Sequence, residues 1–121
     1  QGIGFRKRVN EEGFQVGMTI SNEPGYYENG NFGIRIETVC ITVPKPTANN
    51  FMNKTFCGFE TVTMTPIGTA LVNPSMLSAK EVSWLNAYNA EVCAKLQPIM
   101  EKFFPGSAVD YLKRECQPLT L

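Results

Sequence analysis

The sequence contains no histidine, so no imidazole of this chain can bind a metal or transfer a proton. Its four cysteines, Cys40, Cys57, Cys93 and Cys116, form no Cys-x-x-Cys pair. This disfavours a redox or thiolate–metal motif and favours buried free thiols, which suit a reducing compartment. Eleven basic residues balance eleven acidic ones, which disfavours nucleic acid and anionic membranes as partners. No apolar run approaches the roughly 20 residues that a membrane-spanning helix needs.

What the chain does contain is the composition of one ordinary folded domain. Of its 121 residues, 43% are hydrophobic and 18% are charged, which argues against disorder. Strand-like alternation fills the first part of the chain, and a helical pattern fills the tail. We therefore expect an α+β fold, with antiparallel hairpins in residues 1–77 and helices in residues 78–121.

The central stretch has the pattern of a hairpin. Residues 14–23 alternate between apolar and polar side chains, which is the signal of a half-buried strand. A Pro-Gly pair at 24–25 then interrupts the alternation. An Asn-Gly pair at 29–30, the strongest short hairpin cue, follows it. Residues 32–37 resume the alternation as the returning strand.

Two glutamates lie in the same odd-numbered register of this hairpin. At Glu37 the face changes from polar to apolar (residues 39–43), so we expect Glu37 to be partly buried. We also expect Glu23 and Glu37 to converge with Arg35 close by. At ~4 Å and an effective dielectric of ~20, two such charges repel by roughly 4 kcal/mol. A divalent metal could offset this repulsion, or Arg35 could pair with one glutamate while the other is solvated; the pattern alone favours the ion pair.

A third strand-like segment runs from residue 56 to 67 and is rich in β-branched and aromatic residues. It carries another carboxylate, Glu60, which competes with Glu37 for a metal-binding role. Pro66 should end this strand or mark an edge, because proline has no N–H for the ladder.

The tail begins with a helix-start signal. Ser78 and Glu81 form a capping box, so we expect a helix over residues 78–103, weakened near Pro98. Ser107 is expected to cap a second, short helix. The inward stripe of the first helix consists of Val82, Leu85, Val92, Leu96 and Ile99. The inward residues of the second helix are Val109, Leu112 and Cys116.

Trp84 and Tyr88 lie four residues apart and form a flank of the first helix. Trp84 is therefore freer to meet a partner, and Leu85→Ala should be the more destabilising change. We expect the inward stripe to pack on the sheet face that carries Phe14, Val16, Met18 and Ile20.

The sequence SNEPGYYENGNFGIRIETV (residues 21–39), with FETVTMTPI and the helical tail, resembles the Xaa-Pro aminopeptidases (aminopeptidase P) of the eukaryotic cytosolic type. The resemblance covers nearly the whole chain. It implies the pita-bread fold shared with methionine aminopeptidase and creatinase. It also implies a cytoplasmic metallopeptidase that removes the N-terminal residue from peptides with proline in second position.

In that family the two glutamates that match Glu23 and Glu37 are ligands of a dinuclear centre, commonly of manganese. The resemblance gives Glu23 one metal and the nucleophile's proton, and makes Glu37 the bridge between both metals. Arg35 would orient the carboxylates or offset their charge, and Glu60 would be structural or would support the ligands.

The family site also needs two aspartates and a histidine, which precede this segment. The chain, which begins at Gln1 without a methionine, is therefore read as the C-terminal piece of the catalytic domain of a longer enzyme, inactive by itself. Its expected partners are the N-terminal part of the same enzyme, a peptide substrate and a second copy. The alternative is a non-catalytic pita-bread interaction module, but the two retained glutamates favour the enzyme.

Overall fold

The computed structural model describes residues 13–120. The chain divides into two compact units, with the boundary between Thr63 and Met64. The first unit holds the strands and the second holds the helices, so the fold is α+β as predicted. Residues 64–77 pack with the helices, whereas the sequence-based division fell after residue 77. Among the helices of residues 13–120, none is both long and apolar enough to span a bilayer.

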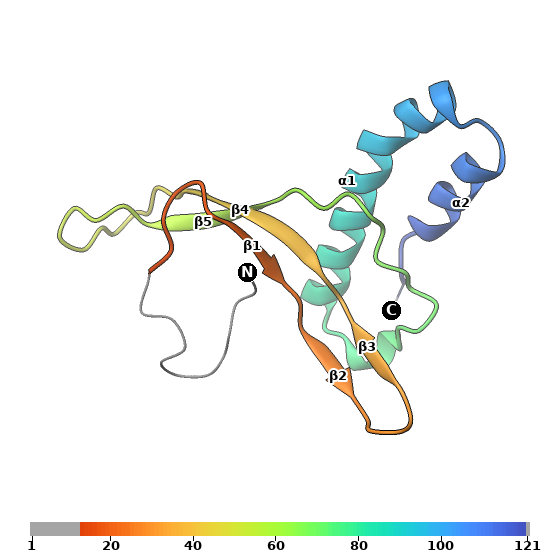
Figure 1. Cartoon of the computed structure of the whole chain (residues 1–121), viewed down its shortest axis with the longest axis horizontal. Coiled ribbons are helices and arrows are strands. Elements are labelled where there is room, and N and C mark those ends of the chain that lie inside the picture. The colour runs from red at the N-terminus through yellow and green to blue at the C-terminus, as the bar shows by residue number, and fades with distance from the viewer. Residues whose placement is uncertain (1–12, 121) are drawn as a thin grey trace. The chain divides into compact units, whose positions relative to one another are not determined.

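The first unit contains two antiparallel sheets. One has the order β1-β4-β5, formed by β1 (Thr19–Asn22), β4 (Thr38–Pro44) and β5 (Cys57–Thr61). The other is the hairpin of β2 (Gly25–Tyr27) and β3 (Gly33–Arg35), which Figure 1 shows at the end of the long ribbons of β1 and β4. Both sheets therefore belong to one long hairpin, whose arms are interrupted by residues 23–24 and 36–37.

The turn of this hairpin lies where the Asn-Gly pair predicted it. The N–H of Asn31 donates to the carbonyl of Glu28 over 3.1 Å, and Gly30 takes a φ of 72°. The Glu28 carboxylate accepts from the Tyr26 hydroxyl at 2.7 Å and from the Asn31 amide at 2.6 Å. These two donors lower the pKa of Glu28, and the bond to Glu28 raises the pKa of Tyr26.

The strands are shorter than predicted at two places. Residues 14–18 form no strand, because a turn in which Met18 N–H donates to the Gln15 carbonyl at 3.1 Å places Gly17 at a φ of 90°. At the other end β5 stops at Thr61, not at residue 67. There the Thr63 hydroxyl oxygen accepts the N–H of Val39 at 2.8 Å, so a side chain takes the place of the backbone ladder.

The buried face of the three-stranded sheet also differs from the prediction. Ile20 is buried as expected, and its neighbour across the ladder, Cys40, is buried with it. Phe14 and Val16, however, are 48% and 52% exposed, because they precede the strand and do not share its face. The prediction that Phe14 and Val16 share the strand face of Ile20 is therefore wrong. The packing of the helical stripe on this face stays a prediction. The odd-numbered residues 39–43 are half-buried.

The second unit contains α1 (Ala79–Phe103) and α2 (Ser107–Glu115), with a short 3₁₀ helix, η1 (Pro74–Met76), before them. The predicted capping box is present at the start of α1. The N–H of Glu81 donates to the Ser78 hydroxyl at 3.3 Å, and the N–H of Ser78 donates to the Glu81 carboxylate at 2.8 Å. The Ser78 donors, the backbone N–H first, lower the pKa of Glu81.

The cap of α2 is not the one predicted. Gly106 is the N-cap residue, with a φ of 91° and no side-chain cap bond, and Ser107 is the first helical residue. The chain reversal after α1 needs this positive φ, which glycine adopts without strain. Pro98 lies inside α1, which continues past it to Phe103.

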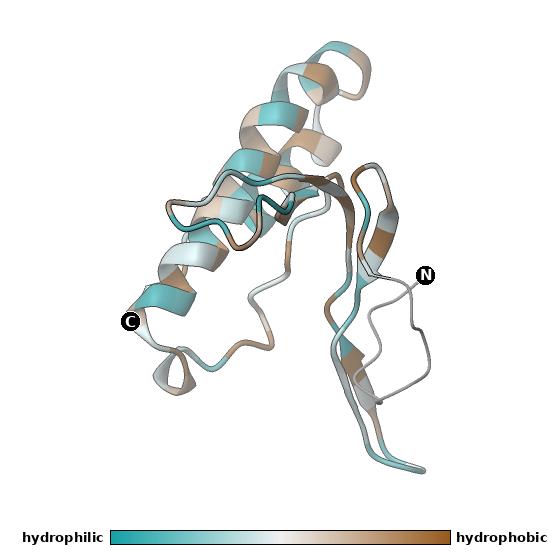
Figure 2. Ribbon diagram, turned by 90° about the vertical axis from the view of Figure 1, so that its left-hand side faces the viewer, coloured by the Kyte–Doolittle hydropathy of each residue, from teal (hydrophilic) through white to brown (hydrophobic). Residues whose placement is uncertain are grey.

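The helical core forms around Tyr88, Val92 and Leu112. Half-buried side chains pack against this cluster: Met64, Ile67, Cys93, Leu96, Met100 and Cys116. Apolar and polar residues accordingly alternate around the turns of α1 in Figure 2. Tyr88, predicted on the flank, is buried and its hydroxyl donates to the Thr65 carbonyl at 2.9 Å, while Ile99 is 52% exposed. Trp84 is 60% exposed, as its flank position predicted.

Two asparagines of α1 form side-chain hydrogen bonds to the backbone of extended segments outside the helix. The amide of Asn89 accepts from Ile67 N–H at 2.9 Å and donates to the Ile67 carbonyl at 3.0 Å. In the same way Asn86 accepts from Leu119 N–H and donates to its carbonyl, both at 2.8 Å. Asn89 is only 1% exposed, so its polar atoms are buried but satisfied.

Candidate metal centre

The backbone register places Glu23 and Glu37 opposite each other. Asn22 pairs with Thr38 in one sheet, so one step further along the hairpin brings Glu23 across from Glu37. The next step is joined by a backbone bond, in which Ile36 N–H donates to the Pro24 carbonyl at 3.1 Å. Residues directly opposite in an antiparallel pair put their side chains on one face. The predicted convergence of the two carboxylates is therefore confirmed.

Arg35 lies between the two carboxylates and contacts both. Its Nη1 is 3.2 Å from Glu23 Oε2, and its Nε is 3.6 Å from Glu37 Oε2. Arg35 therefore pairs with both glutamates, whereas the sequence pattern predicted a pair with only one of them. Ser21 donates its hydroxyl to Glu23 Oε1 at 2.6 Å, so both oxygens of Glu23 are held in place.

The three charged side chains are open to solvent. Glu23, Glu37 and Arg35 are 35%, 43% and 49% exposed. Glu37 is therefore not the partly buried residue that the change of face predicted. Ion pairs at this exposure contribute about 0–1 kcal/mol each, so Arg35 only partly offsets the repulsion of like charges placed opposite each other. The pair stays accessible to a further cation.

Tyr27 is a neighbour that the sequence reasoning missed. A Cβ atom on Gly25 would lie 2.5 Å from the Tyr27 hydroxyl oxygen, and one on Gly33 would lie 2.6 Å from Tyr27 Cδ1. The ring thus lies across two glycines, on the face that carries Arg35. The signal was present in the sequence as Gly25 and Gly33 in register with an aromatic residue, but ordinary turn geometry explained both glycines equally well.

Glu60 is not brought to this pair. It lies opposite Ile41 in the sheet, on the same face as Glu37 but four residues further along β4. At about 3.3 Å per residue this is roughly 13 Å away. Glu60 is exposed, and whether it supports the metal ligands stays a prediction.

The donor chemistry of the pair suits a divalent metal. Carboxylate oxygens are hard ligands of the kind that manganese and magnesium prefer. Two opposed carboxylates on one face therefore fit as part of a metal-binding donor set. Within residues 13–120, no group of three or more His, Cys, Asp or Glu side chains could hold a metal ion.

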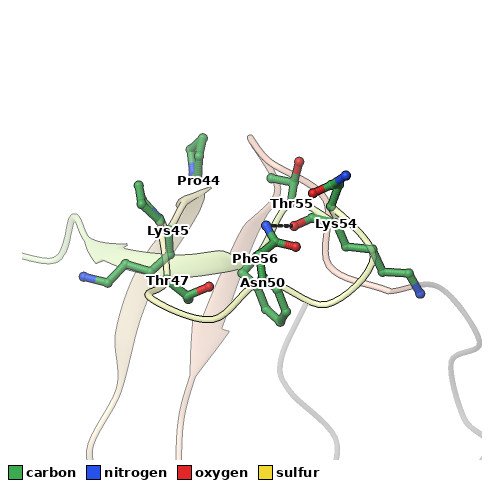
Figure 3. Close-up of a pocket in the computed structure, with 9 residues that line it drawn as sticks. Pro44, Lys45, Thr47, Asn50, Lys54, Thr55 and Phe56 are labelled. Atoms are coloured by element: carbon green, nitrogen blue, oxygen red, sulfur yellow. Dashed lines mark hydrogen bonds between the residues drawn. The ribbon is translucent and has the colours of Figure 1, made fainter.

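A separate pocket of about 230 Å³ lies in the loop that joins β4 to β5 (Figure 3). Lys45 and Lys54 contribute to its lining, and the Asn50 amide donates to the Lys54 carbonyl at 2.9 Å. Neither Glu23 nor Glu37 lines this pocket, so it is not part of the carboxylate site.

The chain is similar to known proteins along nearly its whole length. A family model described as the C-terminal region of peptidase M24 matches residues 55–119. The chain is 45% identical over 119 residues to a probable Xaa-Pro aminopeptidase P of Coprinopsis cinerea, covering 98% of this chain and 19% of that protein. It is 43% identical over 119 residues to Xaa-Pro aminopeptidase 1 of Dictyostelium discoideum, with the same coverage of 98% and 19%.

Among solved structures, the chain is similar to an X-prolyl aminopeptidase from Caenorhabditis elegans, described as a cytosolic enzyme with a di-nuclear active site. The TM-score is 0.78 at 28% identity, over 93% of this chain and 18% of that one. The chain thus spans about a fifth of the length of the relatives that it matches. It belongs to the peptidase M24 family, as a C-terminal part of the pita-bread fold of the Xaa-Pro aminopeptidases.

Proposed function

We propose that this chain is part of an Xaa-Pro aminopeptidase, in which Glu23 and Glu37 are two ligands of a dinuclear divalent metal centre, with manganese as the metal. The observation that carries the proposal is the register that sets the two carboxylates opposite each other on one face. The relatives named as Xaa-Pro aminopeptidases and the di-nuclear site of the nematode enzyme support it.

When bound, such a pair of ions lowers the pKa of a water molecule and polarises the substrate carbonyl. Residues of this chain would position the carboxylates for that chemistry. Ser21 and Arg35 fix the two oxygens of Glu23, so this carboxylate is oriented to accept the proton of the nucleophile. Arg35 also forms an ion pair with Glu37. By a hydrogen bond to one carboxylate and an ion pair to the other it would hold both in position, which is the usual task of residues behind metal ligands.

The proposal extends to the whole protein. Its substrate is a peptide with proline in second position, its location is the cytoplasm, and its partners are the N-terminal part of the same enzyme and a second copy. Residues 1–77 belong to the catalytic domain and residues 78–121 are its helical extension. The isolated chain is inactive and binds manganese weakly, because two carboxylates cannot fill the coordination of two ions.

The test uses the full-length protein and two matched variants, Glu37→Gln and Glu60→Gln. Both remove one carboxylate from the same sheet face. Glu37→Gln should lose bound manganese and more than about 100-fold in hydrolysis of an Xaa-Pro peptide, since even residues behind metal ligands cost 10–100-fold. Glu60→Gln should keep its metal content, measured by mass spectrometry of the eluted ion.

Two results would contradict the proposal. One is a Glu37→Gln variant with normal metal content and turnover. The other is a metal-loaded wild-type protein without turnover, which would favour the interaction module. A separate assay of the isolated chain at saturating manganese should show no hydrolysis above background.

A further inference from the structure

The helical unit brings two thiols together, away from the carboxylate site. Cys93 follows the buried Val92 on α1. Cys116 follows α2, and its N–H donates to the Leu112 carbonyl at 3.0 Å, which places it one turn beyond Leu112. Both cysteines are free and pack against the cluster that contains Val92 and Leu112. Cys93 is also near enough to Cys116 to affect the pKa of its thiol.

We propose that Cys93 and Cys116 form an oxidative modification site, at which a peroxide closes an intramolecular disulfide between α1 and α2. In the first step one thiolate attacks a peroxide oxygen, which breaks the O–O bond, gives a sulfenic acid and releases water. In the second step the other thiol attacks the sulfenic sulfur and releases a second water. Two thiols thus lose two electrons and two protons, and one hydrogen peroxide becomes two waters.

The surroundings of Cys93 and Cys116 determine how fast the disulfide forms. Both side chains are half-buried, so a small oxidant can reach them more easily than a bulky one. Burial first, then the neighbouring Cys93 thiol and the Glu115 carboxylate, raise the pKa of Cys116 to about 11. Glu115 is itself paired with Arg114 at 3.1 Å. Thiolate at Cys116 is therefore scarce at neutral pH, and closure should accelerate as the pH rises towards 11.

A disulfide here would tie the end of α2 to the middle of α1. Cross-links of this kind stabilise a fold mainly by restricting the unfolded chain. The oxidised chain should therefore melt roughly 5–15 °C higher than the reduced chain.

The experiment treats the chain with hydrogen peroxide, blocks remaining thiols with N-ethylmaleimide in denaturant and maps tryptic peptides by mass spectrometry. We expect a mass loss of about 2 Da before blocking. The peptide that ends at Lys95 should be linked to the C-terminal peptide that begins at Glu115, and maleimide should label Cys40 and Cys57. A peroxide-treated chain in which Cys93 and Cys116 both remain labelled would overturn the proposal.

Variants provide the controls. Cys93→Ser should abolish both the cross-link and the rise in melting temperature on oxidation. Cys57→Ser, which changes a half-buried cysteine of the other unit, should preserve both. If Cys57→Ser abolished the rise and Cys93→Ser preserved it, the site would be wrongly assigned. The peptide map of the wild-type chain decides the question even if Cys93→Ser does not fold.

Discussion

The two units of this chain differ in the solvent exposure of the residues that characterise them. In the sheet unit, Glu23, Arg35 and Glu37 are between 35% and 49% exposed. In the helical unit, Val92 and Leu112 are 0% and 2% exposed. The candidate site is thus positioned by backbone pairing, and the helices are positioned by packing.

This difference predicts different vulnerabilities. A slip of one residue in the hairpin would move every side chain to the opposite face, so the site depends on register. Single side chains in the hairpin contribute little to that register. In the helical unit a single truncated side chain leaves a cavity that the surrounding residues cannot fill completely. The following changes test the contrast, from the largest expected effect to the smallest.

The largest effect is expected from Leu112→Ala in the helical core. It should lower the free energy of unfolding by about 2–5 kcal/mol, because it removes a fully buried side chain. Its matched control is Tyr111→Ala, one residue earlier on α2 and 53% exposed, which should change stability by about 0.5 kcal/mol or less. Denaturant melts followed by helical circular dichroism give both values. Equal losses would show that the buried face of α2 is wrongly identified.

A smaller loss is expected from Asn89→Ala. The change leaves the N–H and the carbonyl of Ile67 without their partner and should cost about 1–3 kcal/mol. Asn86→Ala breaks the matching pair of bonds to Leu119 at a less buried position, so its loss should be smaller. Melts of the two variants under identical conditions compare them directly, and the reverse order would contradict the argument from burial.

Arg35→Gln tests the sheet unit and should have a still smaller effect. Its two ion pairs are exposed, so the variant should lose about 1 kcal/mol or less. The loss should shrink at 1 M salt, where charges are screened beyond about 3 Å. Chemical melts at low and high salt measure this difference. A loss of several kcal/mol that is independent of salt would mean that Arg35 has a packing role.

The smallest effect is expected from Glu81→Gln at the start of α1. The pKa of Glu81 is lowered in the folded state, so its charge stabilises the fold above its ordinary pKa of 4.5. This contribution is lost as the pH falls through the lowered value. The variant should therefore be slightly less stable than the wild type at pH 7 and equal to it in strong acid. Melting curves across this range test the sign, and a difference that persists unchanged in acid would exclude the charge as its cause.

Local signals in the sequence predicted the parts of the fold that depend on neighbouring residues. The Asn-Gly turn, the Ser78–Glu81 capping box and the convergence of Glu23 with Glu37 each follow from short-range register or hydrogen bonding. The roles of these glutamates as metal ligands stay a proposal.

The errors arose where a distant segment decides the outcome. Tyr88 is buried because residues 64–67 and α2 pack against α1, and its helical spacing alone could not show this. β5 ends earlier than predicted because the Thr63 hydroxyl oxygen, and not a backbone carbonyl, accepts the N–H of Val39. Helical periodicity gives the positions on each face, but the segments that cover a face come from the tertiary fold.

The asparagine pairs on α1 have a consequence for hydrogen exchange. Ile67 and Leu119 lie outside every helix and strand, yet their amide hydrogens are bonded to side chains of α1. Release of these hydrogens to solvent requires that the asparagine contacts open, which is a local unfolding event of the helical unit. Both amides should therefore exchange slowly, at positions where an assignment of secondary structure would indicate unprotected chain.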